Sequence, residues 1–382
     1  MNRRNFLKLA SSIIAWPLAA KILFRPKIGS AAISRLEKWA PASDPSIRVE
    51  WRYAAGRITD SNQDFGFIIS LSDIRVSGLQ SQQCLIQRQD FNGDKQFVGK
   101  TYTGTLTYDS ATATYTFETD QELVRWQWDE TNQLYKLTVT SPELLLEDLV
   151  LIPQGPLILE GGDGNVKVGR IGNNLLESDY YADWTNIEIG GKEIGVARID
   201  MQGTRRSGVG SDSIDDYDHQ WFVVAAELNN GLPIWVSAWK IEDPEGPFWC
   251  VTIAQGSGVT WQQISSVTEE NEGAMTAPLQ ITTLNSQSLP LESTMWQGAG
   301  AKWLLTAGIS QATDLLNLQI NVPPGQFVSG NIDTTSNWLL EATGIEAEGT
   351  ILGNPISSVK LVVAESSTET EFYLNFLPFL LK

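Results

Sequence analysis

The sequence predicts an all-β protein made of two antiparallel units, each of them a barrel or a sandwich. Short runs rich in Val, Ile, Thr and aromatic residues recur along the chain, as they do in half-buried strands. Residues that favour tight hairpin turns separate several of these runs. Some 350 residues (382 − 32) follow an N-terminal segment that reads as a signal. This length exceeds what one hydrophobic core usually serves, so we expect two units.

The expected strands begin early in this region. Clear examples are VEWRYAAGRI (49–58), FGFIISLSDI (65–74), KTYTGTLTY (100–108) and VRWQWDE (124–130). The hairpin signals are Asn92-Gly93-Asp94, Gly190-Gly191 and Asn230-Gly231. No long amphipathic helix stands out, and SQATDLLNL (310–318) predicts at most a short one. Many short strands with regular turns are typical of barrels and sandwiches.

One polar stretch, QQISSVTEENEG (262–273), interrupts the aromatic strand pattern and marks the best candidate for a domain border. We therefore expect an N-terminal domain over residues 45–258 and a C-terminal domain over residues 259–382. The chain has no repeat with fixed signature residues, which argues against a propeller or a solenoid.

The first 32 residues read as an export signal. MNRRNFLKLASSIIAWPLAA places Arg3-Arg4 before Phe-Leu-Lys and an apolar stretch, and this resembles a twin-arginine signal. Ala31-Ala32 offers small residues for cleavage. We expect a periplasmic or extracellular protein. The alternative is an uncleaved N-terminal anchor, but Lys21 and Arg25 shorten the apolar run below a membrane span, and the mature chain has no other candidate span.

Removal of this segment leaves a strongly acidic protein. The segment carries six basic residues and no acidic ones, so the mature chain has 27 − 6 = 21 basic and 45 acidic residues, a net charge of −24. Such a surface repels nucleic acid and anionic lipid, and neither is an expected partner.

Cys84 and Cys250 are too few for a disulfide framework, and they form either one bridge or two buried free thiols.

The sequence lacks the residues and motifs that several kinds of catalytic and metal site require. A single histidine, His219, cannot build a multi-imidazole site for zinc, copper or iron, and we expect no metal and no cofactor. The sequence lacks the nucleophile-elbow and phosphate-loop motifs. SDSIDDYD (211–218) is acidic but does not have the spacing of an EF-hand loop, so a solvated acidic loop is the better interpretation.

The histidine lies in YDHQW (217–221), where the remaining acid–base chemistry concentrates. In a strand, Tyr217, His219 and Trp221 share one face, whereas Asp218 and Gln220 share the other. If the first face is buried, a phenol, an imidazole and an indole form one cavity wall. If the second face is buried, Asp218 becomes a buried acid whose pKa is raised, which makes it a candidate proton donor.

Fourteen tryptophans allow two interpretations. Trp126 and Trp128 share a strand face, and so do Trp235 and Trp239. These side chains either fill the cores of two β units or line a cavity for an apolar, conjugated ligand.

Four segments, in order along the chain, resemble the CrtC/AttH-like proteins. VEWRYAAGRITDSNQDFGFIISLSDIR (49–75) resembles their opening Glu-Trp-Trp-Tyr-x-x-Gly and Phe-Gly-Phe pattern, with Arg52 replacing the second Trp. SDYYADW (178–184) is similar to their Ser-Tyr-Tyr-Tyr segment, and YDHQW to their Met-Asp-His/Arg-Glu/Gln-Trp strand. NWLLEATGIEAEGTILGNPISSVKLVVAE (337–365) resembles their closing Tyr-Trp-Glu-Gly-Ala…Gly-x-Pro-Val segment.

The resemblance implies two lipocalin-like antiparallel β-barrels. The family includes carotenoid 1,2-hydratases, enzymes that close rings in polyenes, and many predicted secreted hydrolases. In the hydratases a His-x-Trp pair and a following Tyr-x-Asp pair are implicated, and the aspartate protonates the alkene. His219 and Trp221 match the first pair, but IWVSAWKIED (234–243) does not contain the second. Either another acid, Asp218 or Asp183, takes its place, or the protein has no such acid.

These observations lead to a functional hypothesis. We expect the protein to bind an extended apolar molecule, an isoprenoid or polyene, and to catalyse its proton-assisted hydration, isomerisation or cyclisation. A non-catalytic carrier and a secreted hydrolase are the alternatives. The predicted catalytic residues are His219, Asp218 and Tyr217, and the predicted ligand-binding residues are Trp51, Tyr53, Tyr181, Asp183, Trp221 and Trp239.

Overall fold

The computed structural model describes residues 34–369 with internal gaps. The gaps are 45, 62, 77–78, 93–96, 172–173, 207–218, 243–245, 257–260, 271–276, 285–300, 309–310, 312, 323–327, 332–336 and 345. The predicted signal over residues 1–32 therefore lies outside the described residues, as do Tyr217 and Asp218. Within the described part, no helix is long and apolar enough to span a membrane.

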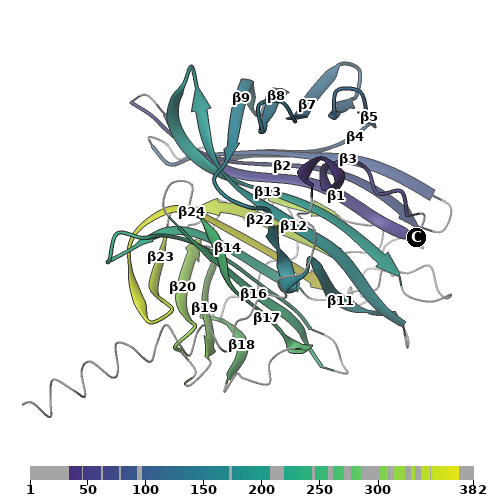
Figure 1. Ribbon diagram of the computed structural model, residues 1–382. Helices are drawn as coiled ribbons and strands as arrows, with labels where there is room; N and C mark the ends of the chain where they lie inside the picture. The colour runs from purple at the N-terminus through teal and green to yellow at the C-terminus, as the bar shows by residue number, and fades with distance from the viewer. Residues whose placement is uncertain are drawn as a thin grey trace, which may run out of the picture.

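The first sheet contains thirteen strands in the order β4-β3-β2-β1-β13-β12-β9-β8-β7-β6-β5, with β10 and β11 also pairing to β12 (Figure 1). The strands are β1 (Ile47–Thr59), β2 (Asp64–Val76), β3 (Leu79–Asp90), β4 (Phe97–Thr103), β5 (Thr105–Asp109), β6 (Thr114–Glu118), β7 (Glu122–Asp129), β8 (Leu134–Thr140), β9 (Leu145–Pro153), β10 (Ile158–Leu159), β11 (Asn165–Ile171), β12 (Asn174–Ile189) and β13 (Lys192–Arg206).

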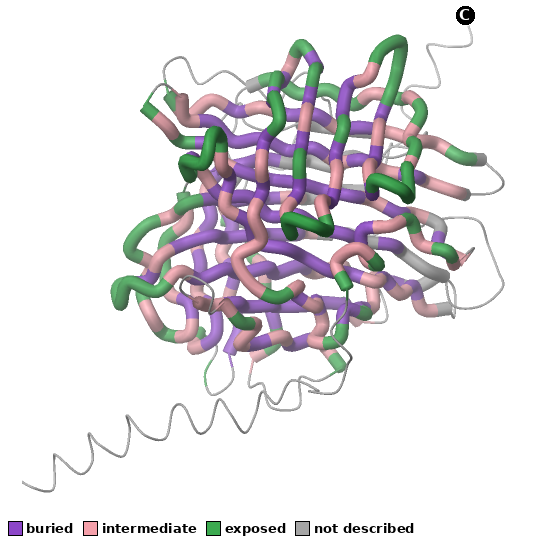
Figure 2. The backbone as a smooth tube through the Cα atoms, turned by 45° about the horizontal axis from the view of Figure 1, so that its top comes forward, coloured by how far each residue is buried: buried purple, intermediate pink, exposed green. Residues whose placement is uncertain are grey.

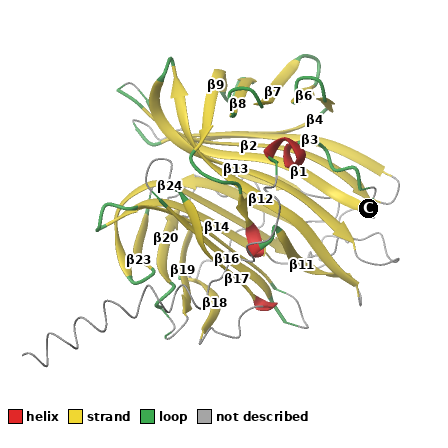
Figure 3. Cartoon of the chain, viewed as in Figure 1, coloured by secondary structure: helices red, strands yellow, loops and turns green. Residues whose placement is uncertain are grey.

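The second sheet contains eleven strands in the order β17-β16-β15-β14-β24-β23-β20-β19-β18, with β22 pairing to β24 and β21 to β22. The strands are β14 (His219–Leu228), β15 (Pro233–Ile241), β16 (Phe248–Gln255), β17 (Gln262–Thr268), β18 (Ala277–Thr283), β19 (Ala301–Gly308), β20 (Leu316–Val322), β21 (Val328–Asn331), β22 (Asn337–Gly344), β23 (Ala347–Ile351) and β24 (Asn354–Glu369). Among the described residues, helix is limited to short elements such as α2 (Arg35–Trp39) and η1 (Glu160–Gly162) (Figure 3).

The predicted fold class is confirmed, with one nearly closed antiparallel barrel and one half-barrel. The chain passes from the first sheet to the second between Arg206 and His219. Strands β14 to β16 therefore belong to the second sheet, although they precede the predicted border at 258/259. The domain border itself stays a prediction.

Turn chemistry explains two of the predicted hairpins. Gly190 and Gly191 join β12 to β13 with φ values of 59° and 78°, a conformation in which a side chain would be strained. Gly231 has a φ of 77° in the turn from β14 to β15. The third predicted turn, at Asn92-Gly93-Asp94, falls mostly outside the described residues.

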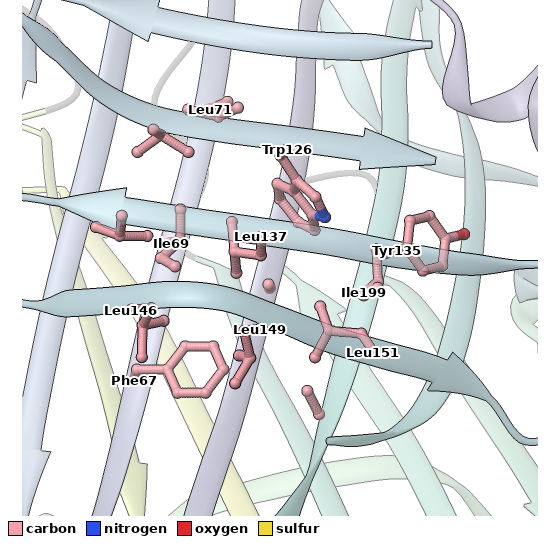
Figure 4. Close-up of a cluster of buried hydrophobic side chains, with 14 of the residues drawn as sticks. Phe67, Ile69, Leu71, Trp126, Tyr135, Leu137, Leu146, Leu149, Leu151 and Ile199 are labelled. Carbon is pink, nitrogen blue, oxygen red and sulfur yellow. The ribbon is translucent and has the colours of Figure 1, made fainter. Parts of the chain in front are cut away.

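The buried side chains form three clusters. The first fills the barrel of the first sheet, where Trp126, Leu137 and Phe67 meet (Figure 4). The second lies inside the second sheet and includes Phe222 and Trp303. The third joins the two sheets, because residues of β1, β2, β12 and β13 pack against residues of β14, β15, β16 and β24. Figure 2 shows this buried band running through the middle of the molecule.

Helix α2 places one side chain inside the first barrel. Trp39 is fully buried, and its indole Nε1 donates to the Ala113 carbonyl oxygen at 2.8 Å. Its ring meets those of Tyr115, Trp126 and Tyr135 at centroid distances of 5.1–5.3 Å. The segment before β1 thus contributes to the core of the first barrel.

The two cysteines are free and buried. Cys84 lies in the first-barrel core and Cys250 in the cluster between the sheets. Of the two possibilities that the sequence leaves open, the structure shows the free thiols. Burial raises the pKa of both thiols, which keeps them protonated and chemically quiet.

Candidate active site

Four of the predicted ligand-binding residues gather between the two sheets. Tyr53, Trp221 and Trp239 are buried in the cluster that joins the sheets, and Trp51 is half-buried against it. The rings of Tyr53 and Trp221 meet edge to face at 5.5 Å. Trp221 and Trp239 are cross-strand partners on β14 and β15. The sequence pattern therefore identifies an aromatic wall that the fold assembles from both sheets.

The other two predicted ligand-binding residues lie on the opposite face of β12. Tyr181 packs in the first-barrel core, whereas its neighbours Tyr180 and Ala182 face the second sheet. Asp183 has 1% of its surface exposed and accepts hydrogen bonds from Arg35 Nε at 2.9 Å and from the Tyr135 hydroxyl at 2.6 Å. The fold does not bring these two residues together with Trp221.

The surroundings of Asp183 suit a structural role. Arg35 makes a further hydrogen bond to Asp183 through Nη2 and also donates to the Gly155 carbonyl oxygen. Burial, followed by the Asp183 charge, raises the pKa of Tyr135 well above its ordinary value, so the phenol stays a donor. An arginine and a phenol thus both donate to the Asp183 side chain and hold it in place.

The predicted catalytic residues lie at the edge of what the structure describes. His219 is the first residue of β14 and pairs with Ile241, but its side chain is not among those described. Tyr217 and Asp218 lie outside the described residues. Their roles stay predictions.

The interface between the sheets also holds a buried ionic cluster. Arg198 on β13 has no exposed surface. Its Nε donates to Asp200 Oδ1 at 2.7 Å, and its Nη2 donates to Glu160 Oε1 at 2.7 Å. Glu160, from η1, is equally buried, and its Oε2 accepts from Cys250 Sγ at 3.8 Å. One cation thus bridges two carboxylates at the boundary of the two sheets.

Aromatic rings surround this cluster. The guanidinium carbon of Arg198 lies 4.7 Å from the ring centroid of Trp184 and 5.5 Å from that of Trp221. Trp184 in turn stacks on Trp235 of the second sheet at 3.9 Å. Such rings tolerate positive charge at their faces and exclude water. The charged groups of the cluster are therefore surrounded by apolar aromatic rings.

The charges of the cluster do not balance. Arg198 supplies one positive charge, whereas Glu160 and Asp200 supply two carboxylates, and Glu365 of β24 adds further negative potential at Asp200. Burial raises the pKa of Asp200 most, Arg198 lowers it and Glu160 raises it again, to about 7. Holding a proton removes the excess buried charge, and this is the physical reason for the shift.

Several polar atoms here have no hydrogen-bond partner among the described residues. They include Arg198 Nη1, Asp200 Oδ2 and the indole nitrogens of Trp184 and Trp239. Native proteins leave few buried polar atoms unsatisfied, and those that remain often mark a site of function. Asp200 therefore combines a free oxygen, a pKa near neutrality and an aromatic surrounding.

Arg198, Asp200 and Glu160 are not among the predicted site residues. A signal for two of them is present in IGVARID (194–200), where an arginine and an aspartate two residues apart interrupt an apolar strand. In a strand, such residues share a face. The sequence gives no sign that both faces of this strand are buried, so this pattern alone does not identify a buried ionic pair.

Replacement of Asp200 by Asn should change how stability depends on pH. The carboxyl has a pKa of about 7 in the folded protein, against an ordinary value of 3.8. Between these values the folded protein holds a proton that the unfolded chain has lost. The resulting stabilisation is fully present below 3.8 and is lost as the pH rises through about 7. Urea unfolding from about pH 4 to about pH 8 should therefore show wild type losing stability relative to Asp200→Asn. A difference that is constant, or that grows with pH, would contradict the shift.

A cleft at the mouth of the first barrel is separate from this cluster. It has a volume of about 240 Å³, and Trp51, Arg52, Glu50 and Tyr115 are among its lining residues. Arg52 donates to the Trp39 and Ala40 carbonyl oxygens and to Glu50 Oε1, so its donors hold α2 in place.

Among the described residues no group of three or more His, Cys, Asp or Glu side chains is arranged to hold a metal ion.

The fold and this interface define a two-unit, lipocalin-like β protein with a buried ionic cluster between its sheets. No protein-family model and no curated protein sequence matches the chain. A provisional AttH protein from Nitrosomonas europaea has a similar structure, with a TM-score of 0.54 at 14% identity over 89% of this chain and 99% of that one. Kievitone hydratase from Nectria haematococca is similar with a TM-score of 0.53 at 11% identity over 90% and 95%. The resemblance to CrtC/AttH-like proteins is thus confirmed at the level of the fold.

Proposed function

We propose that the protein binds an extended isoprenoid or polyene between its two sheets and that Asp200 protonates an alkene of this ligand. The observation that carries the proposal is Asp200 itself, a buried acid with an unpartnered Oδ2 and a pKa of about 7 among aromatic rings. A general acid works best when its pKa lies near the working pH. The fold that the chain shares with a hydratase supports this class of reaction.

Asp200 Oδ2–H gives its proton to one alkene carbon, and the π electrons form the new C–H bond. A carbocation is left on the second carbon, and the Asp200 carboxylate remains bound to Arg198 Nε. In hydration, water adds to this carbon and its extra proton returns to the Asp200 carboxylate. In isomerisation, a neighbouring C–H proton passes to the carboxylate and its electron pair forms a new double bond. In cyclisation, another alkene attacks the cation, and the carbocation that results loses a proton to the same carboxylate. The faces of Trp184 and Trp221, which contact the Arg198 guanidinium, would stabilise the cation.

Access to this site requires movement. Trp184, Trp235 and Trp221 pack against one another or against their neighbours across the interface. A ligand therefore has to displace aromatic side chains or part the two sheets locally. In this proposal His219, two residues before Trp221 on β14, orients the ligand, as the sequence resemblance implies. We also propose that the signal predicted over residues 1–32 exports the protein.

Isotope incorporation tests the proposal. The chain from residue 33 is incubated in D₂O with geranylgeraniol, with lycopene and with a lipid extract of its host, and the recovered molecules are analysed by mass spectrometry. We expect carbon-bound deuterium in a hydrated, isomerised or cyclised product, reduced by at least about a hundredfold in Asp200→Asn. Asp183→Asn is the matched control, because it alters a buried aspartate of the neighbouring strand β12 that faces away from the second sheet.

The outcomes separate enzyme from carrier. Strand β15 carries no carboxylate along PIWVSAWKI, and this favours a carrier as the second candidate. A bound molecule recovered intact and free of deuterium would support the carrier and refute the enzyme. Product formation that survives in Asp200→Asn would refute the role of Asp200. A lack of any apolar ligand would refute both functions.

A further inference from the structure

Strand β3 buries two glutamine side chains that no other described residue satisfies with a hydrogen bond. Gln87 and Gln89 have no exposed surface, and both the oxygen and the nitrogen of each carboxamide lack a hydrogen-bond partner among the described residues. A buried amide normally finds partners, because burial strips it of water. Four unsatisfied atoms on one strand are therefore an unusual concentration.

Both glutamines face the second sheet. Their neighbours Cys84 and Ile86, with the opposite parity, lie in the first-barrel core. Gln87 is the cross-strand partner of Ile68, which belongs to the cluster between the sheets. Directly opposite residues of antiparallel strands share a face, so the two carboxamides lie at the interface and not inside the barrel.

The second sheet adds a hydroxyl beside them. Thr343 on β22 is fully buried, and its Oγ1 also lacks a partner. This oxygen lies only 2.1 Å from the position that a Cβ of Gly66 would occupy. Gly66 is the cross-strand partner of Gln89. Because Gly66 has no side chain, the Thr343 hydroxyl can pack directly against the backbone of β2 next to Gln89.

Gln87 shares a transverse row of the first sheet with Arg198 of the ionic cluster, and Gln89 lies two residues further along β3. One transverse row of paired residues crosses the first sheet from Arg198 through Ala55 and Ile68 to Gln87. Neighbouring strands are ~4.8 Å apart, so three steps separate the two ends by roughly 14 Å. The residues between them are small or apolar. The interface thus presents polar groups at two ends of an apolar strip.

We propose that Gln87, Gln89 and Thr343 bind the uncharged polar end of the ligand, a hydroxyl or a carbonyl. The inference rests on the proposed function, because it places the apolar body of the same ligand along the strip towards Asp200. Carboxamides and a hydroxyl offer both donors and acceptors but no charge. They match an alcohol, ketone or phenol, whereas a carboxylate would be buried without a counter-charge. The ligand class is therefore an oxygenated isoprenoid or polyene and not a pure hydrocarbon.

Two probes of the same skeleton test this site. Binding of farnesol and of farnesene to the chain from residue 33 is followed by quenching of tryptophan fluorescence. We expect farnesol to bind wild type about tenfold more tightly, the effect of one or two hydrogen bonds. In Gln87→Leu/Gln89→Leu this preference should vanish while farnesene binds equally well or better. Thr343→Val should reduce the preference in part, and Gln121→Leu, on the exposed surface, should leave it intact.

Thermal unfolding without ligand gives a second readout. Replacing unsatisfied amides by apolar groups of similar shape should raise the Tm of Gln87→Leu/Gln89→Leu, so the variant is expected to fold. A lower Tm would mean that ordered water or another group satisfies the amides, and this would overturn the proposal. An unchanged farnesol preference in the double variant would overturn it as well.

The two proposals fail in different ways. Equal binding of farnesol and farnesene by wild type, together with deuterium incorporation that depends on Asp200, would refute the polar-end site and leave the proposed function standing. If neither probe binds and no product forms, both proposals fall. Loss of the preference in Gln87→Leu/Gln89→Leu with intact farnesene binding supports the site.

Discussion

Replacing Arg198 by methionine is expected to lower the free energy of unfolding by about 3–5 kcal/mol. Arg198 is the cation that bridges the buried carboxylates of Glu160 and Asp200, each at 2.7 Å. Its removal leaves two buried acids that must either stay charged without a partner or take up protons. Equilibrium unfolding in urea measures the loss, and it should be larger above pH 7 than at pH 5, because Asp200 with its pKa of about 7 is protonated at the lower pH.

The control removes the whole cluster. Glu160→Gln/Arg198→Met/Asp200→Asn has no buried charge left, and replacement of a complete buried ion cluster by neutral groups is often close to neutral. We expect this triple variant to recover most of the lost stability. If Arg198→Met alone stays within about 1 kcal/mol of wild type, solvent must reach the cluster and the interface cannot be closed as described.

Replacing Trp39 by alanine should also lower the free energy of unfolding by about 3–5 kcal/mol. Its indole fills the first barrel against Tyr115, Trp126 and Tyr135, and the substitution leaves a cavity as well as an unpaired Ala113 carbonyl oxygen. Urea unfolding gives the magnitude. Near-ultraviolet circular dichroism should lose intensity, because three rings lose their fixed neighbour.

The matched control comes from the same short helix. Glu37 is exposed and pairs with Lys38 at 3.5 Å, so Glu37→Ala should change stability by less than about 0.5 kcal/mol. An equally small effect of Trp39→Ala would mean that the segment before β1 does not fill the barrel. A small effect of Trp39→Ala together with a large effect of Glu37→Ala would reverse the assignment of the helix faces.

The strands were predictable because the patterns that indicate them involve residues close together in the sequence. VEWRYAAGRI is rich in strand-forming residues, and Gly190-Gly191 and Asn230-Gly231 favour tight turns. Strands β1, β12–β13 and β14–β15 form where these patterns lie. The aromatic wall of Trp221 and Trp239 was predictable for the same reason, since both residues share a strand face with other apolar residues. The fold class follows from such patterns together with the chain length.

The remaining features of the fold and of the candidate site depend on contacts between residues far apart in the sequence, which local patterns do not predict. Arg35 and Asp183 are 148 residues apart, so no local pattern indicates that Asp183 already has a partner. Both faces of β13 are buried because the second sheet covers one of them, and no pattern within β13 indicates this cover for Arg198 and Asp200. The change of sheet between Arg206 and His219 is likewise set by the pairing of β14 with β24, whereas the predicted border near 262–273 stays a prediction.

The pairing of β14 with β24 has a consequence for the order in which the protein is made. All strands of the first sheet precede residue 207, so this barrel can close while the ribosome still synthesises the remainder. One edge of β14 then has no strand to pair with until β24 has been synthesised, because Trp221 pairs with Glu365 and Val223 with Val363. By then β14–β16 have already supplied Trp221, Trp235 and Cys250 to the contacts with Arg198, Trp184 and Glu160. β24, the last strand that the structure describes, adds Leu361 and Val363 to the buried cluster between the sheets.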